Sequence, residues 1–452
     1  MNLIDMQQKF FRTGATRSVD YRIRQLRSLY QVILQYQERI MQALREDLSK
    51  SEQESYLTEI GMVLSEISYA LRHLRRWSRP KGGGFSLAAP FSVNRVYPEP
   101  YGVALVIAPF NYPFQLALSP VVSALAAGNC AILKPSEYAP NTAAVISEML
   151  NNNFEQRLLA VVTGGPEGGQ SLLGQDFDYI FFTGGKTVGQ KVYEAAARGM
   201  VPVTLELGGK SPCLVDASAD IEEAARRIVW GKCLNAGQTC VAPDYLLVQD
   251  SVKQKLIAEM CRAIEKFYSA APEQNPDYPR IINQAHYERL CEMLGEGTVV
   301  AGGRTNEQEL KISPTIIENA PFYSKLMNDE IFGPLLPVIE FSQLEQAYEY
   351  ISLHERPLAL YLFTRRPQVE REVLQKIQFG GGCVNDTVIH LCPHDMPFGG
   401  IGPSGIGSYH GKAGFDTFTH YKSVLKTRGR LDLQLRYPPF GKVSPLVQRL
   451  LR

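Results

Sequence analysis

Hydrophobic residues recur at three- and four-residue steps between about residues 18 and 78, with polar residues filling the positions between them. The apolar positions that set this period are Leu26, Tyr30, Ile33, Leu34, Ile40, Leu44 and Leu48. Such spacing predicts amphipathic helices. The period ends near Pro80 and three successive glycines, after which prolines and alternating apolar residues up to Gly102 predict extended chain, either a domain boundary or a projecting arm.

Five apolar runs of strand length follow, and stretches of helix-compatible sequence separate them. The runs are YGVALVIAP, GNCAILKP, LLAVVTGG, DYIFFTGG and VPVTLELGG. This alternation is typical of an α/β fold with a parallel sheet and helices on both faces, in which ligands bind at the carboxyl ends of the strands. The alternation resumes after Gly209 and predicts a second α/β domain, and FDTFTHYKSVLKTR should pair with the earlier arm or with a partner subunit's arm.

Composition narrows the function classes. The 452 residues include 47 basic and 46 acidic ones, giving a net charge of +1 without long runs of one sign, so no nucleic-acid partner is expected. No secretory signal and no stretch of about eighteen apolar residues is present, which indicates a cytoplasmic protein without a membrane span. The eight cysteines lack paired spacing, which favours reduced thiols. The final KVSPLVQRLLR is interpreted as a packed or frayed tail, with contact to a membrane surface as the alternative.

Three short motifs resemble ligand sites but are better explained otherwise. GIGPSG, residues 400–405, has the dinucleotide-loop spacing, yet it contains a proline and follows no strand. GGKT, residues 184–187, lacks the first glycine of a phosphate-binding P-loop. HLCPH, residues 390–394, offers three metal-binding side chains without a fourth, so we expect a loop or pocket lining and no metal.

Three residues carry the candidate chemistry. Cys240 lies in NAGQTCVAPD, a glycine-containing loop before a strand, where a thiol can be accessible to a substrate; an inert apolar cysteine is the alternative. Glu206 ends the strand VPVTLE, where burial would raise its pKa toward that of a general base; a solvated cap is the alternative. Asn111 follows VALVIAP and is either a turn or N-cap residue or an amide donor to an oxyanion.

Seven blocks along nearly the whole chain together resemble the aldehyde dehydrogenase superfamily. In order they are PFNYPF, GNCAILKPSE, FTGGKTVG, LELGGKSP, GQTCVAPDY, NDEIFGP and MPFGGIGPSG. The short N-terminus with PLALYLF, VNDT and YHGKAGFDTFTH is more similar to the class 3 branch, which includes fatty aldehyde dehydrogenases. The resemblance implies a Rossmann-like dinucleotide-binding domain (1–82 and 101–207), a catalytic α/β domain (208–411), a small β oligomerisation arm (83–100 and 412–436) and a C-terminal tail (437–452).

The resemblance also implies roles for individual residues. Cys240 would be the nucleophile, Glu206 the general base, and Asn111 with the Cys240 backbone N–H the oxyanion hole. NAD, with NADP possible, would be held by Lys134 and Glu137 at the adenosine ribose, by Glu330 and Phe332 at the nicotinamide end, and by a strand-to-helix turn comprising Thr183, Gly184, Gly185, Gly189 and Leu207. Many family members carry a serine at the position of Gly185.

The expected substrate pocket comprises Tyr112, Trp230, Thr239, His390 and Leu391, which suits medium- or long-chain aliphatic or aromatic aldehydes, although Trp230 could equally be a core residue. A homodimer joined through the arm and the YHGK segment is expected. Two alternatives are a coenzyme A-acylating enzyme, which generally lacks the carboxylate of LELGG, and a catalytically silent binding or structural homologue.

Overall fold

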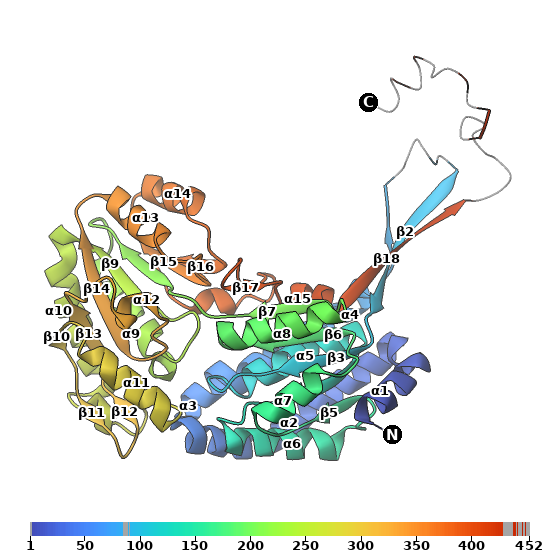
Figure 1. Ribbon diagram of the computed structural model, residues 1–452, viewed down its shortest axis with the longest axis horizontal. Helices are drawn as coiled ribbons and strands as arrows, with labels where there is room; N and C mark the ends of the chain where they lie inside the picture. The colour runs from blue at the N-terminus through green and yellow to red at the C-terminus, as the bar shows by residue number, and fades with distance from the viewer. Residues whose placement is uncertain are drawn as a thin grey trace.

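The structure is a computed structural model that describes residues 2–84, 89, 91–427, 437–439, 441, 445 and 448. Figure 1 shows two α/β bodies side by side and a narrow arm that projects away from both. The C-terminal tail expected at 437–452 and the end of the arm beyond Thr427 lie largely outside the described residues. The α/β architecture predicted from the sequence is confirmed.

The first body is built on a six-stranded sheet of order β17-β7-β6-β3-β4-β5, in which all strands except β17 are parallel. Its strands are β3 (Val103–Ile107), β4 (Cys130–Lys134), β5 (Leu159–Val161), β6 (Tyr179–Thr183), β7 (Val203–Glu206) and β17 (Gly405–Ile406). Its helices are α1 (Leu3–Arg12), α2 (Val19–Leu48), α3 (Glu52–Ser55), α4 (Gly61–Trp77), α5 (Gln115–Ala127), α6 (Pro140–Asn153), α7 (Pro166–Leu173) and α8 (Lys186–Arg198). Every residue of α5 is buried, and this helix forms the inner layer between the sheet and α2 and α4.

The second body has a seven-stranded sheet of order β10-β13-β14-β9-β8-β15-β16, parallel except for β10. Its strands are β8 (Pro212–Val215), β9 (Tyr245–Gln249), β10 (Thr298–Ala301), β13 (Thr315–Glu318), β14 (Leu335–Phe341), β15 (Ala359–Phe363) and β16 (Gly381–Val384), and a separate pair is β11 (Thr305–Asn306) with β12 (Lys311–Ile312). Its helices are α9 (Ile221–Cys233), α10 (Asp250–Tyr268), α11 (Gln284–Leu294), α12 (Lys325–Asn328), α13 (Leu344–Ser352) and α14 (Pro367–Lys376).

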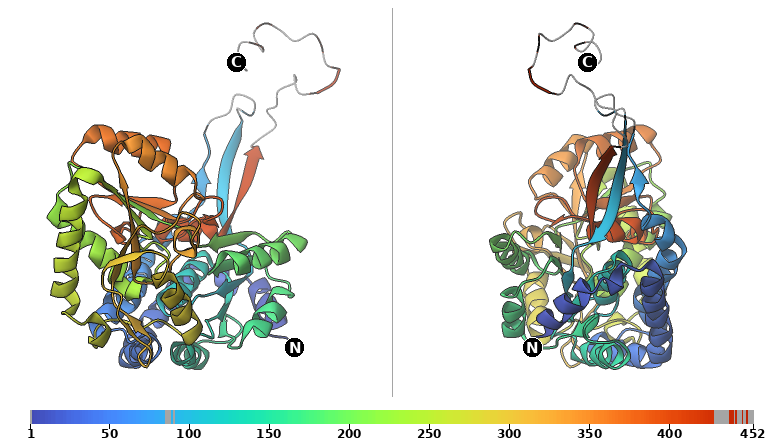
Figure 2. Two further views of the ribbon diagram at one scale, coloured as in Figure 1. Left: turned by 60° about the vertical axis from the view of Figure 1, so that its left-hand side comes forward. Right: turned by 90° about the vertical axis from the view of Figure 1, so that its right-hand side faces the viewer.

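The arm consists of β1 (Lys81–Gly82), β2 (Ser92–Pro100) and β18 (Thr419–Thr427) in the order β1-β2-β18. Strands β2 and β18 pair antiparallel over their full length, and Figure 2 shows the pair rising away from the two bodies. Of the two alternatives for the C-terminal strand, pairing with the earlier arm of the same chain is therefore observed. The outer edge of β18 has no strand beside it among the described residues, which is the edge that a second strand could join.

Two segments depart from the arrangement expected from the sequence. The helical stretch 18–78 is interrupted: α2 ends at Leu48, its C-cap Ser49 is left-handed with φ of 55°, and a π-helical turn, Tyr56–Ile60, separates α3 from α4. A 3.6-residue period does not reveal such a turn. The second departure is β17, which lies within the range assigned to the catalytic domain but pairs with β7 of the first sheet. The short helix α15 (Gly411–Thr417) likewise packs on α4 and α5.

None of the helices that the structure describes combines the length and the apolar composition needed to cross a bilayer. All eight cysteines lie in the described part of the chain, and each is a free thiol.

Candidate functional site

Cys240 lies in a tight loop between α9 and β9. The loop begins with three consecutive left-handed residues, Asn235, Ala236 and Gly237, with φ of 53°, 52° and 76°. At Gly237 a Cβ would come 2.2 Å from the carbonyl oxygen of Gly333, so only glycine fits there. The left-handed backbone of Ala236 costs conformational energy, and such strain persists only where the surrounding structure holds the residue in place. The loop leaves Cys240 partly exposed beside the apolar core.

Glu206 is the last residue of β7 and is only 3% exposed. Neither of its carboxylate oxygens has a hydrogen-bond partner in the structure. Its backbone carbonyl accepts from the Gly184 N–H at 3.0 Å, and β17 pairs beside it at Gly405. Burial raises the pKa of Glu206 well above its ordinary value, because nothing compensates the loss of water around the charged form.

Asn111 follows β3 and is buried against the Cys240 loop. Its side-chain amide donates to the Gln238 carbonyl at 3.0 Å, and its own carbonyl accepts from the Asn235 amide at 2.7 Å. One amide hydrogen of Asn111 therefore fixes the side chain, and the second remains available to a ligand.

The three candidate catalytic residues, which are remote in the sequence, meet in one place. Burial raises the pKa of the Cys240 thiol, and the charges of Glu330 and Glu206 raise it further. The N–H groups of Cys240 and Val241 face the sulfur and act in the opposite direction. These interactions place the thiol beside two carboxylates and beside backbone donors, while Gln238 connects its loop to Asn111.

A groove of about 680 Å³ runs along the carboxyl ends of β4 and β5, with Glu137 in its wall. Its lining comprises Pro135, Ser136, Glu137, Pro140, Ala143, Ala144, Ser147, Glu148, Thr163, Gly164 and Gly165. Lys134 ends β4 and is buried, and its Nζ forms an ion pair with Glu137 at 2.7 Å. The two residues expected at the ribose are thus side by side, and one carboxylate oxygen of Glu137 has no partner at hydrogen-bond distance among the described residues.

The turn from β6 into α8 presents bare backbone. Thr183 is buried, and its hydroxyl has no hydrogen-bond partner in the part of the chain that the structure describes. A Cβ at Gly185, the N-cap of α8, would meet nothing within 4 Å, so this position faces open space. A Cβ at Gly189 would lie 2.5 Å from Leu207, and one at Gly184 would lie 2.6 Å from the ring of Phe182, so glycine lets the helix approach the sheet closely at both positions.

Glu330 and Phe332 lie in the segment between α12 and β14. The carboxylate of Glu330 lies against Gly208, where a Cβ would come within 1.9 Å of Oε2, and Oε1 has no partner. Burial, and then the charge of Asp244, raises the pKa of Glu330 to about 8. Phe332 has a positive φ of 49°, and its ring packs edge-on against Phe110 at 5.7 Å.

Two expected pocket residues are joined by a hydrogen bond: the Tyr112 hydroxyl lies 2.7 Å from the Thr239 hydroxyl, and both side chains are buried. Thr239 directly precedes Cys240 in the chain, so this pair lies beside the nucleophile. Trp230 is 38% exposed on α9, so of its two interpretations the core position is wrong.

His390 is buried with its Nε2 unpartnered, and burial lowers its pKa to about 4, which keeps the ring neutral. Its Nδ1 lies 3.6 Å from the Cys383 sulfur, whereas His394 contacts Glu66 at 2.9 Å. The two histidines of HLCPH thus serve different partners, and no cluster of metal-binding side chains occurs among the described residues. Leu391 is half-buried next to His390.

The YHGK segment differs from its expected role at a dimer interface. Tyr409, His410 and Gly411 are buried inside the same chain, and the Gly411 N–H donates to Glu66 at 2.7 Å. Only Lys412 of this segment is partly exposed. Tyr409 instead lies near the site, since the charges of Glu206 and Cys240 act on its hydroxyl.

Three functional candidates were missed in the sequence: Lys50, Glu54 and Glu59, which reach the Asn111 and Cys240 segments from the helical region before α4. These three charged residues lie in the stretch that the sequence predicts to be amphipathic helix. Charged residues on such helices are mostly solvated, so the sequence did not indicate that they belong to a site.

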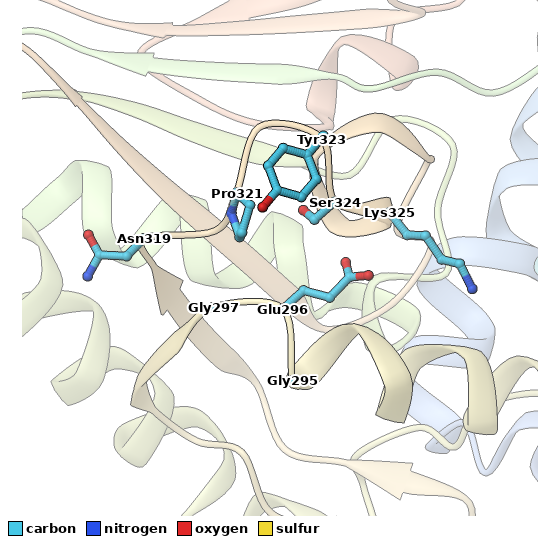
Figure 3. A pocket seen from close by; sticks show the side chains of 8 residues that line it. All are labelled: Gly295, Glu296, Gly297, Asn319, Pro321, Tyr323, Ser324 and Lys325. Carbon is cyan, nitrogen blue, oxygen red and sulfur yellow. The ribbon is translucent and has the colours of Figure 1, made fainter.

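A further hollow, of about 500 Å³, lies away from these residues between the end of α11 and the loop before α12. Figure 3 shows its lining of Gly295, Glu296, Gly297, Asn319, Pro321, Tyr323, Ser324 and Lys325. The Glu296 carboxylate is engaged by the Leu326 N–H at 2.6 Å, and none of the predicted site residues contributes to the wall.

Comparison with known proteins agrees with this geometry. The model of the "Aldehyde dehydrogenase family" matches residues 2–424. The chain is 44% identical to 4,4'-diaponeurosporen-aldehyde dehydrogenase of Staphylococcus aureus over 97% of each chain, and 43% identical to human aldehyde dehydrogenase family 3 member B1 over 95% of this chain and 92% of that protein. A solved structure described as the substrate-bound state of Staphylococcus aureus AldH superposes with a TM-score of 0.98 at 42% identity, covering all of both chains. The chain therefore belongs to the aldehyde dehydrogenase family and is an oxidoreductase acting on aldehydes, a family that uses NAD(P).

Proposed function

We propose that this enzyme oxidises aldehydes to carboxylic acids by a hydrolytic route, with Cys240 as the nucleophile and Glu206 as the general base. The observation that carries the proposal is the pair of unpartnered carboxylate oxygens on buried Glu206, beside the Cys240 thiol. A buried carboxylate without partners is destabilising, and it is retained where a ligand or water will bind.

The chemistry is assigned to the residues in order. The Cys240 thiol, which its raised pKa keeps neutral at rest, passes its proton to a water molecule as the sulfur attacks the aldehyde carbon. The Asn111 amide and the Cys240 N–H stabilise the oxygen that becomes negative, a contribution of about 10² to 10³ in rate for one donor. Bound NAD(P) would supply the acceptor for the hydride that leaves this carbon, and Cys240 would then carry a thioester. Glu206 takes a proton from the water that attacks the thioester, and Cys240 departs as the leaving group.

The residues present fit a dinucleotide. The groove beside Glu137, the open backbone at Gly185, the unpartnered Thr183 hydroxyl and the unpartnered Glu330 Oε1 are features that a bound cofactor would satisfy. We assign the adenosine ribose to Lys134 and Glu137, the pyrophosphate to the turn formed by Thr183, Gly184, Gly185, Gly189 and Leu207, and the nicotinamide end to Glu330 and Phe332. NAD is favoured, because the Glu137 carboxylate suits a ribose hydroxyl and repels a phosphate.

The substrates that we propose are apolar aldehydes, aliphatic or aromatic. Tyr112 and Thr239 lie beside Cys240, and the remaining lining is assigned to Trp230, His390 and Leu391. The names of the Staphylococcus relative and of the class 3 relatives agree with an aldehyde substrate. A homodimer joined at the free edge of β18 is part of the proposal, as is the division into dinucleotide-binding, catalytic and arm regions.

The decisive experiment is a stopped-flow measurement of NADH with aldehyde in excess. We expect Glu206→Gln to give one NADH per active site rapidly and then to stall, because hydride transfer precedes the step that needs the base. Adding a strong small thiol nucleophile should restart the stalled enzyme by accepting the acyl group. Sustained turnover by Glu206→Gln would contradict the base role. A wild-type enzyme that turns over only with coenzyme A would instead support the acylating alternative.

A further inference from the structure

We propose that Lys50, Glu54 and Glu59 form a buttress, fully buried at Lys50 and Glu59 and partly buried at Glu54, that holds Asn111 and the Cys240 loop in the geometry needed to stabilise the oxyanion. These three side chains contact the backbone on which the candidate catalytic groups are mounted. The inference rests on the proposed oxyanion role of Asn111, and it concerns positioning residues that touch no substrate.

Lys50 lies at the centre of the buttress. Its side chain is fully buried, its Nζ donates to Glu59 Oε1 at 2.6 Å, and the same nitrogen donates to the Asn111 carbonyl at 3.1 Å. The ammonium also lies 4.1 Å from the centre of the Tyr112 ring, a cation–π distance. One cation thus contacts two consecutive residues, the oxyanion donor and a residue of the substrate pocket.

Glu59 uses its second oxygen for the next segment of the chain. Oε2 accepts from the N–H groups of Phe114 and Gln115 at 3.0 and 2.9 Å, where α5 begins. The first N–H groups of a helix have no partner within the helix, and the partial positive charge there favours a carboxylate. Glu59 therefore fixes the far end of the turn that carries Asn111, while Lys50 fixes its beginning.

Glu54 reaches the loop of the nucleophile. Its Oε1 accepts from the Asn235 N–H at 2.8 Å, at the first of the three left-handed residues before Cys240. The side-chain amide of Asn235 donates to the Asn111 carbonyl, which also accepts a hydrogen bond from the Lys50 ammonium. The strained loop and the Asn111 turn are thereby joined through the same carbonyl oxygen.

The π-helical turn explains how Glu54 and Glu59 act together. In an α-helix, residues five apart point in directions that differ by about 140°. The wider π turn at Tyr56–Ile60 reduces this divergence, so both carboxylates face the site. At Gly61, a Cβ would come 2.8 Å from the Tyr56 carbonyl oxygen, so the absence of a side chain permits the turn. π turns often occur at functional sites.

The first test compares the rate constant of the NADH burst in Lys50→Met, Glu54→Leu and Glu54→Gln. A misplacement of about 1 Å can slow catalysis by about 10²-fold, so we expect the burst to slow by about 10- to 100-fold in Lys50→Met and Glu54→Leu. The KM for aldehyde should change little, since the oxyanion forms only after binding. Glu54→Gln retains an acceptor for the Asn235 N–H and should restore most of the rate. The burst rate constant does not depend on the fraction of enzyme that is folded.

Asp216→Asn is the matched control. Asp216 is also fully buried and hydrogen-bonded, to the Ser218 N–H and the Thr364 hydroxyl, but it lies beyond the opposite end of β8 from the site. This variant should lose stability and keep the burst rate constant. A burst that slows equally in Asp216→Asn would overturn the positioning role, because any buried carboxylate would then have the same effect.

The second test is a double-mutant cycle with Asn111→Ala. Positioning through Asn111 predicts that Lys50→Met slows the burst by less than about twofold once Asn111 is alanine. The full Lys50→Met effect in that background would overturn the proposal. If Asn111→Ala alone leaves the burst unchanged, the oxyanion role fails and the buttress proposal fails with it. If Asn111→Ala slows the burst and Lys50→Met does not, only the buttress proposal fails.

Discussion

Two buried glutamates in this enzyme have opposite surroundings. Glu59 has an ion pair on one oxygen and two helix N–H donors on the other, whereas neither oxygen of Glu206 has a partner. Both are buried, and burial raises the pKa of each, but at Glu59 the charge of Lys50 and the backbone donors act against that rise.

This difference distinguishes residues that stabilise the scaffold from residues that are available for the reaction. A satisfied buried charge stabilises one arrangement of the backbone, and removing its partner leaves an uncompensated charge. An unsatisfied buried carboxylate destabilises the free enzyme and remains available to water or substrate. The Lys50–Glu59 pair of the buttress belongs to the first kind, and Glu206 of the cleft to the second.

The largest effect is expected on the cleft side, from Cys240→Ala. Removing a nucleophile has cost on the order of 10⁶ in turnover in a well-studied protease, and we expect a loss of about 10⁴ or more here. The free energy of unfolding should change by less than about 1 kcal/mol, because the substitution removes a single atom from a partly exposed position. Steady-state NADH formation and urea unfolding measure the two quantities. A variant that retains turnover would assign the nucleophile elsewhere.

The next effect is on the free energy of unfolding and differs between the two regions. Lys50→Met leaves Glu59 buried without its counter-charge and should lower the free energy of unfolding by about 3–5 kcal/mol. Glu206→Gln removes an unsatisfied carboxylate and should leave that free energy unchanged or raise it. Urea unfolding of both variants under one buffer condition makes the comparison. Equal destabilisation by both variants would show that the carboxylates of Glu59 and Glu206 do not differ in how far their charges are compensated.

The sequence predicted the cleft better than the buttress. Cys240, Glu206 and Asn111 each stand at the end of a strand or beside a glycine-rich loop, where the topology of an α/β fold brings side chains together. The same logic located Gly184, Gly185 and Gly189 at a strand-to-helix turn. Strand and helix alternation was sufficient for the central strands β3, β4 and β6 of the first sheet, since each is a mainly apolar run.

The buttress could not be predicted because its geometry depends on a π turn. Glu54 and Glu59 would diverge on a regular helix, so a 3.6-residue period suggests two unrelated surface charges. Likewise, the return of β17 to the first sheet depends on tertiary pairing that residue spacing does not encode. Tyr409 and His410 were assigned to a dimer surface for the same reason and proved to be buried within the chain.

A smaller effect concerns the pH dependence of the free energy of unfolding and again tests a carboxylate of the cleft. The pKa of Glu330 is about 8, above the ordinary 4.5, so the folded state binds a proton that the unfolded state releases between these values. Its contribution to stability is present below about pH 4.5 and is lost as pH rises through about 8. Unfolding free energies measured without cofactor at about pH 5 and about pH 9 should therefore differ less in Glu330→Gln than in the wild type. An unchanged difference would show that Glu330 titrates normally.

The smallest effect is expected from Gly185→Ser at the first turn of α8. The position is an N-cap with extended backbone and open space around a Cβ, so a serine fits and should stabilise the protein by only a few tenths of a kcal/mol. If the pyrophosphate binds at this turn, the added hydroxyl supplies a donor and should lower the Kd for NAD by about threefold, consistent with a net hydrogen bond of about 0.5–1.5 kcal/mol. Isothermal titration with NAD measures this change, and Gly185→Ala, which adds the Cβ without the hydroxyl, is the control. A tighter Kd in Gly185→Ala as well would attribute the gain to the added Cβ and not to the hydroxyl, and no gain in Gly185→Ser would place the phosphates away from this turn.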